Sequence, residues 1–386
     1  MAASRILTTH VGSLPRPAAL SELLIREEAG EPIDKAALDR ETVAAVQDVV
    51  RRQVEAGIDV ISDGEQPRVG FQTYVPQRLE GFGGESKRKS PPDYVRFPAF
   101  AAAVAARFPR RSKVRNAPQA VADVAYKDLA PAVRECDLFD RATAQQPGKF
   151  VDRFMTAASP GIIATTMLNA HYDSHEAYVF ALAREMRKEY ALILERGYVL
   201  QLDAPDLAME RCVMCQDEPL SAFQKMVETN VAAINRAIED LPRERIRLHC
   251  CWGNWEGPHL DDVPLADVLP LIVQAKVGTL SMEFANPRHQ HEYAELKRHG
   301  LPKDMMLMPG VIDSTVSYVE HPQVIANRIC EAVDAVGDKE RVIAGVDCGF
   351  GTFAGYEWVP GEIVWAKLAA LAEGARIATK KLWGRT

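Results

Sequence analysis

The sequence predicts an α/β protein built as a single (β/α)8 TIM barrel, which spans residues 1–386 and carries a long insertion after its second strand. Three observations favour this fold. Short runs of β-branched residues alternate eight times with longer segments whose apolar residues recur at helical spacing. This alternation of strands and helices is the one that a parallel barrel requires. No linker rich in glycine, serine or proline divides the chain into two domains.

The expected elements follow one another along the whole chain. Runs rich in β-branched residues predict strands at residues 6–11, 60–64, 162–167, 199–203, 246–251, 279–284, 305–311 and 342–347. Apolar residues at helical spacing predict helices that include residues 38–56, 175–196, 222–240, 324–336 and 362–382. Each helix would return the chain from the end of one strand to the start of the next.

Residues 66–120, after the second expected strand, are too long a connection for an ordinary barrel loop. The segment is strongly basic, because Asp93 is the only acid between Ser86 and Asn116. It is either a solvated surface excursion or a flap over the barrel mouth that recognises an anionic group of a substrate. Its basic residues are Lys87, Arg88, Lys89, Arg96, Arg107, Arg110, Arg111, Lys113 and Arg115.

The composition excludes several classes of protein. With 47% hydrophobic residues, 26% charged residues and a net charge of -7, the chain has the composition of a soluble globular protein, and nucleic acid is not expected as a partner. Neither a secretory signal pattern nor an apolar stretch of membrane-spanning length occurs, so we expect a cytoplasmic protein without a membrane partner. Seven cysteines argue against a disulfide framework. The oligomeric state stays open, a homo-oligomer included.

Polar side chains follow most of the expected strands at their C-terminal ends, where barrel enzymes build their active sites. We therefore expect these residues to converge on one rim of the barrel. In strand order they are His10, Gly12 and Ser13, then Asp63 and Glu65, then Asp203, His249 and Cys251, Glu283, Asp313, and finally Asp347 and Cys348.

Part of this rim has the residue types of a metal site. Side chains two positions apart on a strand point the same way, so His249 and Cys251 should face the rim while Cys250 faces the other side as a buried residue. Cys348 can add a second thiolate and Glu283 an oxygen. One histidine, two cysteines and one glutamate make a tetrahedral set that suits Zn²⁺. The alternative is an inert set of core residues.

Other conspicuous residues receive structural interpretations. Cys212 and Cys215 have the C-x-x-C spacing, but no second pair completes a metal site. The glycines between Gly349 and Gly355 lack the dinucleotide-binding spacing, so they should let the backbone turn closely past the rim. The remaining histidines of this region are interpreted as surface residues of the sixth helix: His289, His291 and His299.

The ligand types point to a reaction. Two thiolates and a carboxylate outweigh the charge of a zinc ion, which makes the centre poor at activating water but able to bind a substrate thiol. Binding lowers the thiol pKa from about 8.5 and keeps the sulfur nucleophilic at neutral pH. Glu65, Asp203 and Asp313 are the candidate catalytic carboxylates. Glu65 and Asp203 would either bind a substrate ammonium or pair with arginines such as Arg68.

A series of motifs also resembles a known family. The motifs are TTHVGSLPRP, ISDGEQPRVGF, QLDAP, HCCWGNWEGPH, MEFANPR, PGVIDS and GVDCGFGT. They resemble the C-terminal catalytic barrel of the cobalamin-independent methionine synthase family from about Thr8 to the C-terminus. The resemblance implies zinc on His249, Cys251, Glu283 and Cys348. It also implies homocysteine contacts with the backbone near Gly12 and Ser13 and with the carboxylates of Glu65 and Asp203. His10, on the same rim, is a further candidate substrate-binding residue.

The chain departs from that family in three places. We expect no additional N-terminal barrel. Where the family has a histidine after the seventh strand, the sequence DSTVSY offers Thr315. A tryptophan that stacks on the pterin in the family has no equivalent after the third strand, where His171 and Tyr172 are the nearest substitutes. The identity of the methyl donor is therefore open.

These observations predict a zinc-dependent thiol S-alkyltransferase whose partners are a small thiol and an alkyl or methyl donor. Methyl transfer to homocysteine or a related thiol is the main hypothesis. Epoxide opening, as in the epoxyalkane:coenzyme M transferases, is an alternative within the same chemistry. A metal-free decarboxylase of the uroporphyrinogen type and a non-catalytic zinc-binding protein are alternatives from other classes.

Overall fold

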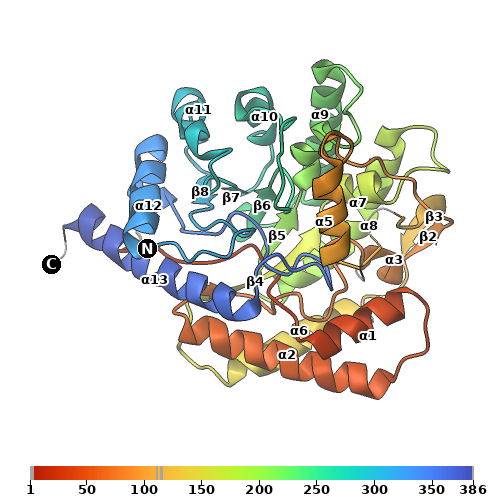
Figure 1. The fold of residues 1–386 in the computed structure, drawn as a ribbon, viewed down its shortest axis with the longest axis horizontal. Coiled ribbons are helices and arrows are strands. Elements are labelled where there is room, and N and C mark those ends of the chain that lie inside the picture. The colour runs from red at the N-terminus through yellow and green to blue at the C-terminus, as the bar shows by residue number, and fades with distance from the viewer. Residues whose placement is uncertain (1–3, 110–111, 114–115, 385–386) are drawn as a thin grey trace.

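The computed structural model describes residues 4–109, 112–113 and 116–384, so Arg110, Arg111 and Arg115 of the basic segment lie outside the described residues. Six parallel strands form one curled sheet at the centre of the molecule (Figure 1). Their order is the order of the chain. The strands are β1 (Val60–Ile61), β4 (Asp152–Ala158), β5 (Val199–Asp203), β6 (Ile246–Cys250), β7 (Thr279–Met282) and β8 (Met306–Pro309).

The two edges of this sheet are linked through the first and eighth predicted strands. Val342 forms a parallel bridge to β8, and Ala344 forms another to Thr8. The carbonyl oxygen of Thr8 accepts a hydrogen bond of 3.0 Å from the backbone N–H of Val60 in β1. Both segments lie where a barrel needs them, although they pair over too few residues to form regular strands. The architecture is TIM-barrel-like.

Eight helices surround the strands, and each packs against the next until the last meets the first. Figure 1 shows them on the outside of the sheet. The five predicted helices are confirmed within three residues at either end. In order around the sheet the helices are α2 (Lys35–Glu55), α6 (Ala130–Ala144), α8 (His175–Glu195), α9 (Leu220–Ala237), α10 (Leu265–Ile272), α11 (Tyr293–His299), α12 (Pro322–Val336) and α13 (Gly361–Trp383).

The predicted third strand, residues 162–167, is wrong. These residues belong to helix α7 (Pro160–Thr166), and the strand is β4, which comes just before it. The side chain of Ser159 caps the helix by accepting a hydrogen bond of 3.2 Å from the N–H of Ile162, and Pro160 occupies the first helical position. Every residue of α7 is buried, so its continuous apolar run resembles a buried strand.

The long segment after β1 forms a small layer beside the sheet. It contains α3 (Val75–Arg78), β2 (Leu79–Gly83), α4 (Asp93–Arg96) and α5 (Pro98–Arg107), and β2 pairs antiparallel with β3 (Gln119–Tyr126). Tyr94 of α4 stacks on Trp255 in the loop after β6, with 5.3 Å between ring centroids. Phe108, just after α5, contacts Trp358. Helices α4 and α5 therefore cover loops at the C-terminal ends of the strands.

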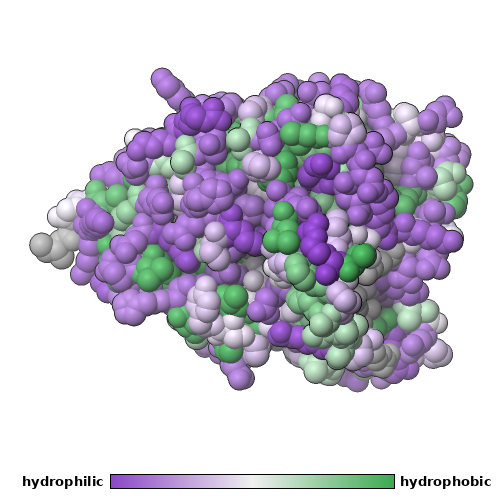
Figure 2. Space-filling model, turned by 45° about the horizontal axis from the view of Figure 1, so that its top comes forward, coloured by the Kyte–Doolittle hydropathy of each residue, from purple (hydrophilic) through white to green (hydrophobic). Residues whose placement is uncertain are grey.

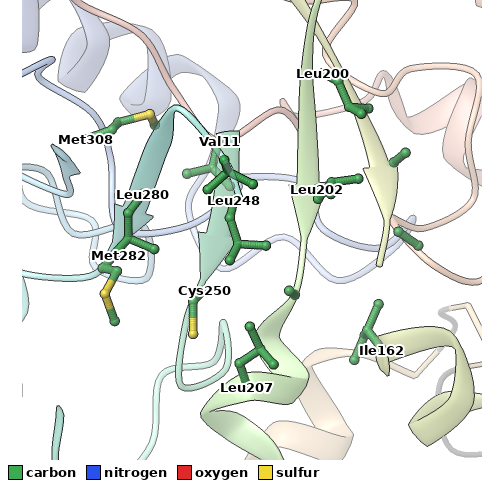
Figure 3. Packing of buried hydrophobic residues seen from close by; sticks show 14 of the residues in the cluster. Val11, Ile162, Leu200, Leu202, Leu207, Leu248, Cys250, Leu280, Met282 and Met308 are labelled. Atoms are coloured by element: carbon green, nitrogen blue, oxygen red, sulfur yellow. The ribbon is translucent and has the colours of Figure 1, made fainter. Parts of the chain in front are cut away.

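Side chains alternate between two environments along the strands. One set packs into the apolar core under the helices, and Figure 3 shows its members on neighbouring strands: Leu200, Leu202, Leu248, Cys250, Leu280 and Met282. The intervening side chains are polar, buried and hydrogen-bonded to one another inside the barrel. Arg247 Nε donates to Gln201 Oε1 (2.6 Å), and Gln201 Nε2 donates to Asp203 Oδ1 (2.7 Å). Because neighbouring side chains of a strand point to opposite sides, one set forms the apolar core and the other set points into the barrel.

The molecular surface is mainly hydrophilic on the face shown in Figure 2, where apolar side chains occur in small separate groups. Helix α1 (Ala18–Glu28) adds to the outside of the ring by packing against α2. Among the described residues, no helix combines the length and the apolar character needed to cross a membrane.

Candidate functional site

Three of the four predicted metal ligands lie together at one end of the barrel. His249 is the penultimate residue of β6, Cys251 is the first residue after this strand, and Cys348 follows the eighth strand segment. Their ligand atoms all lie within 4.8 Å of one another, and all three residues are buried. Cys348 Sγ is 3.7 Å from His249 Nε2 and 3.8 Å from Cys251 Sγ.

These separations match the edges of a tetrahedral zinc site. Zn–S bonds of about 2.3 Å and a Zn–N bond of about 2.1 Å place two sulfur ligands about 3.8 Å apart and a sulfur and a nitrogen about 3.6 Å apart. The donor set also has the soft sulfur atoms that zinc accepts in proteins. His249, Cys251 and Cys348 therefore fit a zinc ion, with one tetrahedral position left for a further ligand.

His249 is prepared for metal binding by its surroundings. Burial, followed by the nearby Arg247, lowers the pKa of His249 to about 3, so the imidazole is neutral. His249 Nδ1 lies 3.4 Å from the hydroxyl oxygen of Ser281 on β7. We assign the Nδ1 proton to this contact, which leaves the lone pair of Nε2 facing Cys348.

The cysteines behave as the period of two residues predicts. Cys250 points away from the cluster into the apolar core, where burial raises the pKa of its thiol. The hydrogen bond to Cys251 and burial raise the pKa of the Cys348 thiol. The Cys348 thiol must therefore lose a proton when a metal binds.

The structure does not bring Glu283, the fourth predicted ligand, into this group. Its Oε1 accepts a hydrogen bond of 3.0 Å from the N–H of Trp252, the residue after Cys251. Its Oε2 accepts one of 2.8 Å from the side chain of Asn286. Glu283 thus lies beside the metal ligands with both oxygens engaged elsewhere.

A cavity of about 430 Å³ opens onto the three ligands and extends under α4. Its walls come from the barrel rim and from the segment after β1. Aromatic side chains form much of this wall, and none of them is among the predicted rim residues: Phe71, Tyr94, Trp255, Phe353 and Tyr356. His171 and Tyr172 contact Asp123 and Val124 instead and do not appear among the described residues that line the cavity.

Glu65 and Asp203 line the same cavity. Thr156 Oγ1 donates to Glu65 Oε1 (2.9 Å), while Glu65 Oε2 is buried and has no hydrogen-bond partner within the described part of the chain. Burial raises the pKa of Glu65 to about 7, although Arg68 and Arg16 oppose the shift. Burial and the neighbouring Glu65 raise the pKa of Asp203. A cation between the two carboxylates would relieve this cost.

Arg68 does not take the role of that cation. It forms an ion pair of 2.9 Å with Glu135 and donates to the backbone oxygen of Thr156. This geometry therefore disfavours the interpretation in which Glu65 and Asp203 pair directly with Arg68.

The other predicted rim residues take different places. Ser13 lines the cavity, whereas His10 is buried beside it, with Nε2 2.7 Å from Gln53 Oε1 and Nδ1 accepting from the N–H of Gly12. Gly12 has φ +129°, and a Cβ there would lie 2.7 Å from Glu65 Oε1. The close approach of this backbone to Glu65 therefore requires glycine.

Two rim aspartates hold loops. Asp313 accepts hydrogen bonds of 2.8 Å from both the N–H and the hydroxyl of Thr315, and it lies outside the described lining of the cavity. Asp347 accepts from the backbone N–H groups of Phe284 and Asn286, which fixes the chain just after Glu283. Both carboxylates thus shape the rim through its backbone.

Four cations of the basic segment have acidic partners, so less charge remains for an anionic ligand than the sequence suggests. Arg88 and Lys89 line the cavity, as does Lys113. The ion pairs are Arg88 with Glu210, Lys89 with Asp217, Arg96 with Asp261 and Arg107 with Glu256.

His289 is not the surface residue that the sequence predicts, although His291 and His299 are exposed. It precedes α11 in an irregular loop, where helical spacing says nothing about burial. Its ring stacks on Trp252 at 3.8 Å, and its nitrogens lie 3.1 Å from Asp262 and 2.8 Å from Glu292. Burial alone would lower the pKa of His289, but these carboxylates raise it to about 9.

The remaining motifs have the expected structural roles. A Cβ on Gly349 would lie 2.0 Å from the hydroxyl oxygen of Ser13, so this glycine lets the backbone pass close to the rim. Cys215 Sγ contacts Met226 Sδ at 4.0 Å. Cys212 also lines the cavity, where its thiol donates to the carbonyl oxygen of Met209 (3.2 Å).

The chain is similar to known proteins over nearly its whole length. A methionine synthase of Saccharolobus solfataricus is 25% identical over 381 residues, which cover 97% of this chain and 95% of the relative. A methionine synthase of Sulfurisphaera tokodaii is 24% identical over 379 residues, which cover 97% and 93%.

Two solved structures share the fold. The B12-independent methionine synthase from Shewanella sp. W3-18-1, in complex with selenomethionine, has a TM-score of 0.73 at 22% identity and covers 98% of this chain and 99% of its own. The putative vitamin-B12 independent methionine synthase from Listeria monocytogenes has a TM-score of 0.65 at 20% identity and covers 99% and 100%. The family model for the cobalamin-independent synthase catalytic domain matches residues 6–370. The chain therefore belongs to the cobalamin-independent synthase family and corresponds to the catalytic domain of that family.

Proposed function

We propose that this protein is a zinc-dependent thiol S-methyltransferase of the cytoplasm that methylates homocysteine or a closely related small thiol. The observation that carries the proposal is the cluster of His249, Cys251 and Cys348, which faces a covered cavity beside two buried carboxylates. The similarity to proteins named methionine synthase supports the choice of thiol. We also infer that the strand segments around Thr8 and Ala344 close a single eight-stranded barrel, and that residues 66–120 form its flap.

In this proposal His249, Cys251 and Cys348 hold the zinc ion, and Glu283 is its fourth ligand when no thiol is bound. Zinc, when bound, lowers the pKa of a thiol at the open position and leaves its sulfur nucleophilic. Glu65 and Asp203 bind the substrate ammonium, because Glu65 Oε2 is buried without a partner among the described side chains and backbone groups. This contact fixes the direction from which the sulfur attacks.

The reaction also requires that water be kept away from the alkyl donor, and α4 contributes to this by covering part of the cavity. Tyr94 and Trp255 stack on each other in the wall of the cavity, and in this proposal they limit the access of water to the alkyl donor while the sulfur attacks it. The aromatic lining favours a donor with a flat ring over a small aliphatic epoxide. The ion pairs of Arg88 and Lys89 also weaken the case for a sulfonate-bearing thiol in the cavity.

The test combines metal analysis with a substrate matrix. Homocysteine, coenzyme M and glutathione are each incubated with methyltetrahydrofolate, methylcobalamin or an epoxide, and S-alkylated products are read by mass spectrometry. We expect about one zinc per chain and product with homocysteine and a methyl donor. Cys251→Ser should lose both, whereas Cys250→Ser, one position along on the opposite face, should keep the zinc. A wild-type protein that is active without zinc would contradict the proposal.

A further inference from the structure

The carboxylate of Glu283 is held by three hydrogen-bond donors beside the metal ligands. Trp252 N–H donates to Oε1, while Asn286 Nδ2 and Arg288 Nη2 donate to Oε2 at 2.8 and 3.3 Å. Glu283 is buried, so each of these contacts replaces a lost contact with water. In its present place Glu283 is not one of the clustered ligands, and because Oε2 accepts two of these hydrogen bonds, any shift of the carboxylate toward the metal ligands strains the contacts with Asn286 and Arg288.

Arg288 is itself held in place by a second carboxylate, that of Asp262. Its Nη1 donates to Asp262 Oδ2 at 2.6 Å. Asp262 also binds His259 at 3.1 Å and His289 at 3.1 Å. Hydrogen bonds from these two histidines keep the pKa of Asp262 at about 2 against the opposing effect of burial, so Asp262 is ionised and anchors the guanidinium.

Taking the proposed function as its basis, we propose that Arg288 is a positioning residue that weakens metal ligation by Glu283, so that the incoming thiol displaces this carboxylate more easily. The positive charge of Arg288 attracts the same carboxylate that a zinc ion would attract. Arg288 and the metal therefore compete for Glu283, and the thiol enters the position that Glu283 leaves.

In this role Arg288 lowers the affinity for the metal, whereas a residue that supports a metal ligand raises it. A residue that orients a metal ligand strengthens metal binding, and its removal typically weakens affinity by about 10- to 100-fold. Removal of a competitor does the opposite. Because a hydrogen bond to a charged group is stronger than a neutral one, loss of Arg288 should tighten zinc binding by about tenfold.

The test measures zinc affinity in four proteins, by competition of the zinc-loaded enzyme with a chromogenic chelator. They are wild type, Arg288→Ala, Glu283→Gln and the double variant. We expect Arg288→Ala to lower the zinc Kd about tenfold and to raise the KM for the thiol more than it changes kcat. In the Glu283→Gln background, the same arginine substitution should change the zinc Kd less than twofold.

Two matched variants serve as controls. Arg298→Ala, on exposed α11, removes an equal charge that pairs with Glu295 and should leave the zinc Kd unchanged. Arg288→Lys keeps the charge and should retain most of the wild-type behaviour if Arg288→Ala does not fold. Weaker zinc binding in Arg288→Ala, or tighter binding that persists in the Glu283→Gln background, overturns the inference. If the wild-type protein binds no zinc, the proposed function fails together with the inference. This outcome differs from the two results above, which contradict only the role of Arg288.

Discussion

The buried imidazolium of His289 should make the stability of the fold depend on pH. Two carboxylates raise the pKa of His289 from 6.5 to about 9. A histidine whose pKa is raised on folding stabilises the folded state fully below its unfolded pKa. That contribution is lost as the pH rises through the folded pKa. The relevant window therefore runs from about pH 6.5 to about pH 9.

The size of the effect follows from the shift. A difference of about 2.5 pKa units corresponds to about 3 kcal/mol of unfolding free energy, at about 1.4 kcal/mol per unit. The side chain is only 4% exposed, so solvent screening reduces this value little. Wild type should lose about 3 kcal/mol of stability between pH 6 and pH 9.5 through this residue.

The measurement is urea unfolding at closely spaced pH values, with a chelator present throughout so that metal binding does not contribute. His289→Gln should show a curve flatter by this amount across the window. His291→Gln, two residues along and exposed, is the control and should follow wild type. If His289→Gln and wild type change in parallel between pH 6 and pH 9.5, the assignment of a buried imidazolium is wrong.

Three further substitutions test other parts of the site. Gly12→Ala places a Cβ 2.5 Å from Thr156 Cγ2 at a backbone φ of +129°, so thermal unfolding should show a loss of about 2 kcal/mol, and normal stability would refute this close approach. Glu65→Gln should raise the KM for homocysteine at least tenfold in steady-state assays but affect a thiol without an amino group little. Equal effects on both thiols would argue against ammonium binding. Tyr94→Ala should speed labelling of the cluster cysteines by a thiol reagent, whereas Val95→Ala, at a site 82% exposed, should not.

The metal cluster could be predicted from the sequence because it depends on rules that hold within single strands. A period of two residues places His249 and Cys251 on one face and Cys250 on the other, and parallel strands bring their C-terminal ends to the same rim. The place of Glu283 could not be predicted this way. Its carboxylate direction depends on donors from Asn286 and Trp252, which are fixed only when the loops fold.

The third strand was mispredicted because an apolar run that is buried all round has no period to read. Ser159 and Pro160 were the available signal, since serine followed by proline marks the start of a helix. The surroundings of His289 had no local signal. Its partners Asp262 and Trp252 lie in a loop after another strand, and only the closed barrel brings the two loops together.

The short distance between Cys251 and Cys348 has a consequence for handling the protein. Their sulfur atoms lie 3.8 Å apart on segments that are distant in the chain. Without a metal, peroxide can oxidise the two thiols to a disulfide while it takes up their two electrons and two protons to become two water molecules, and this single event removes two ligands. In the proposed zinc form, the metal would therefore also protect the two thiols from oxidation, and preparations stripped of metal in air should lose their capacity to bind zinc until a reductant restores the thiols.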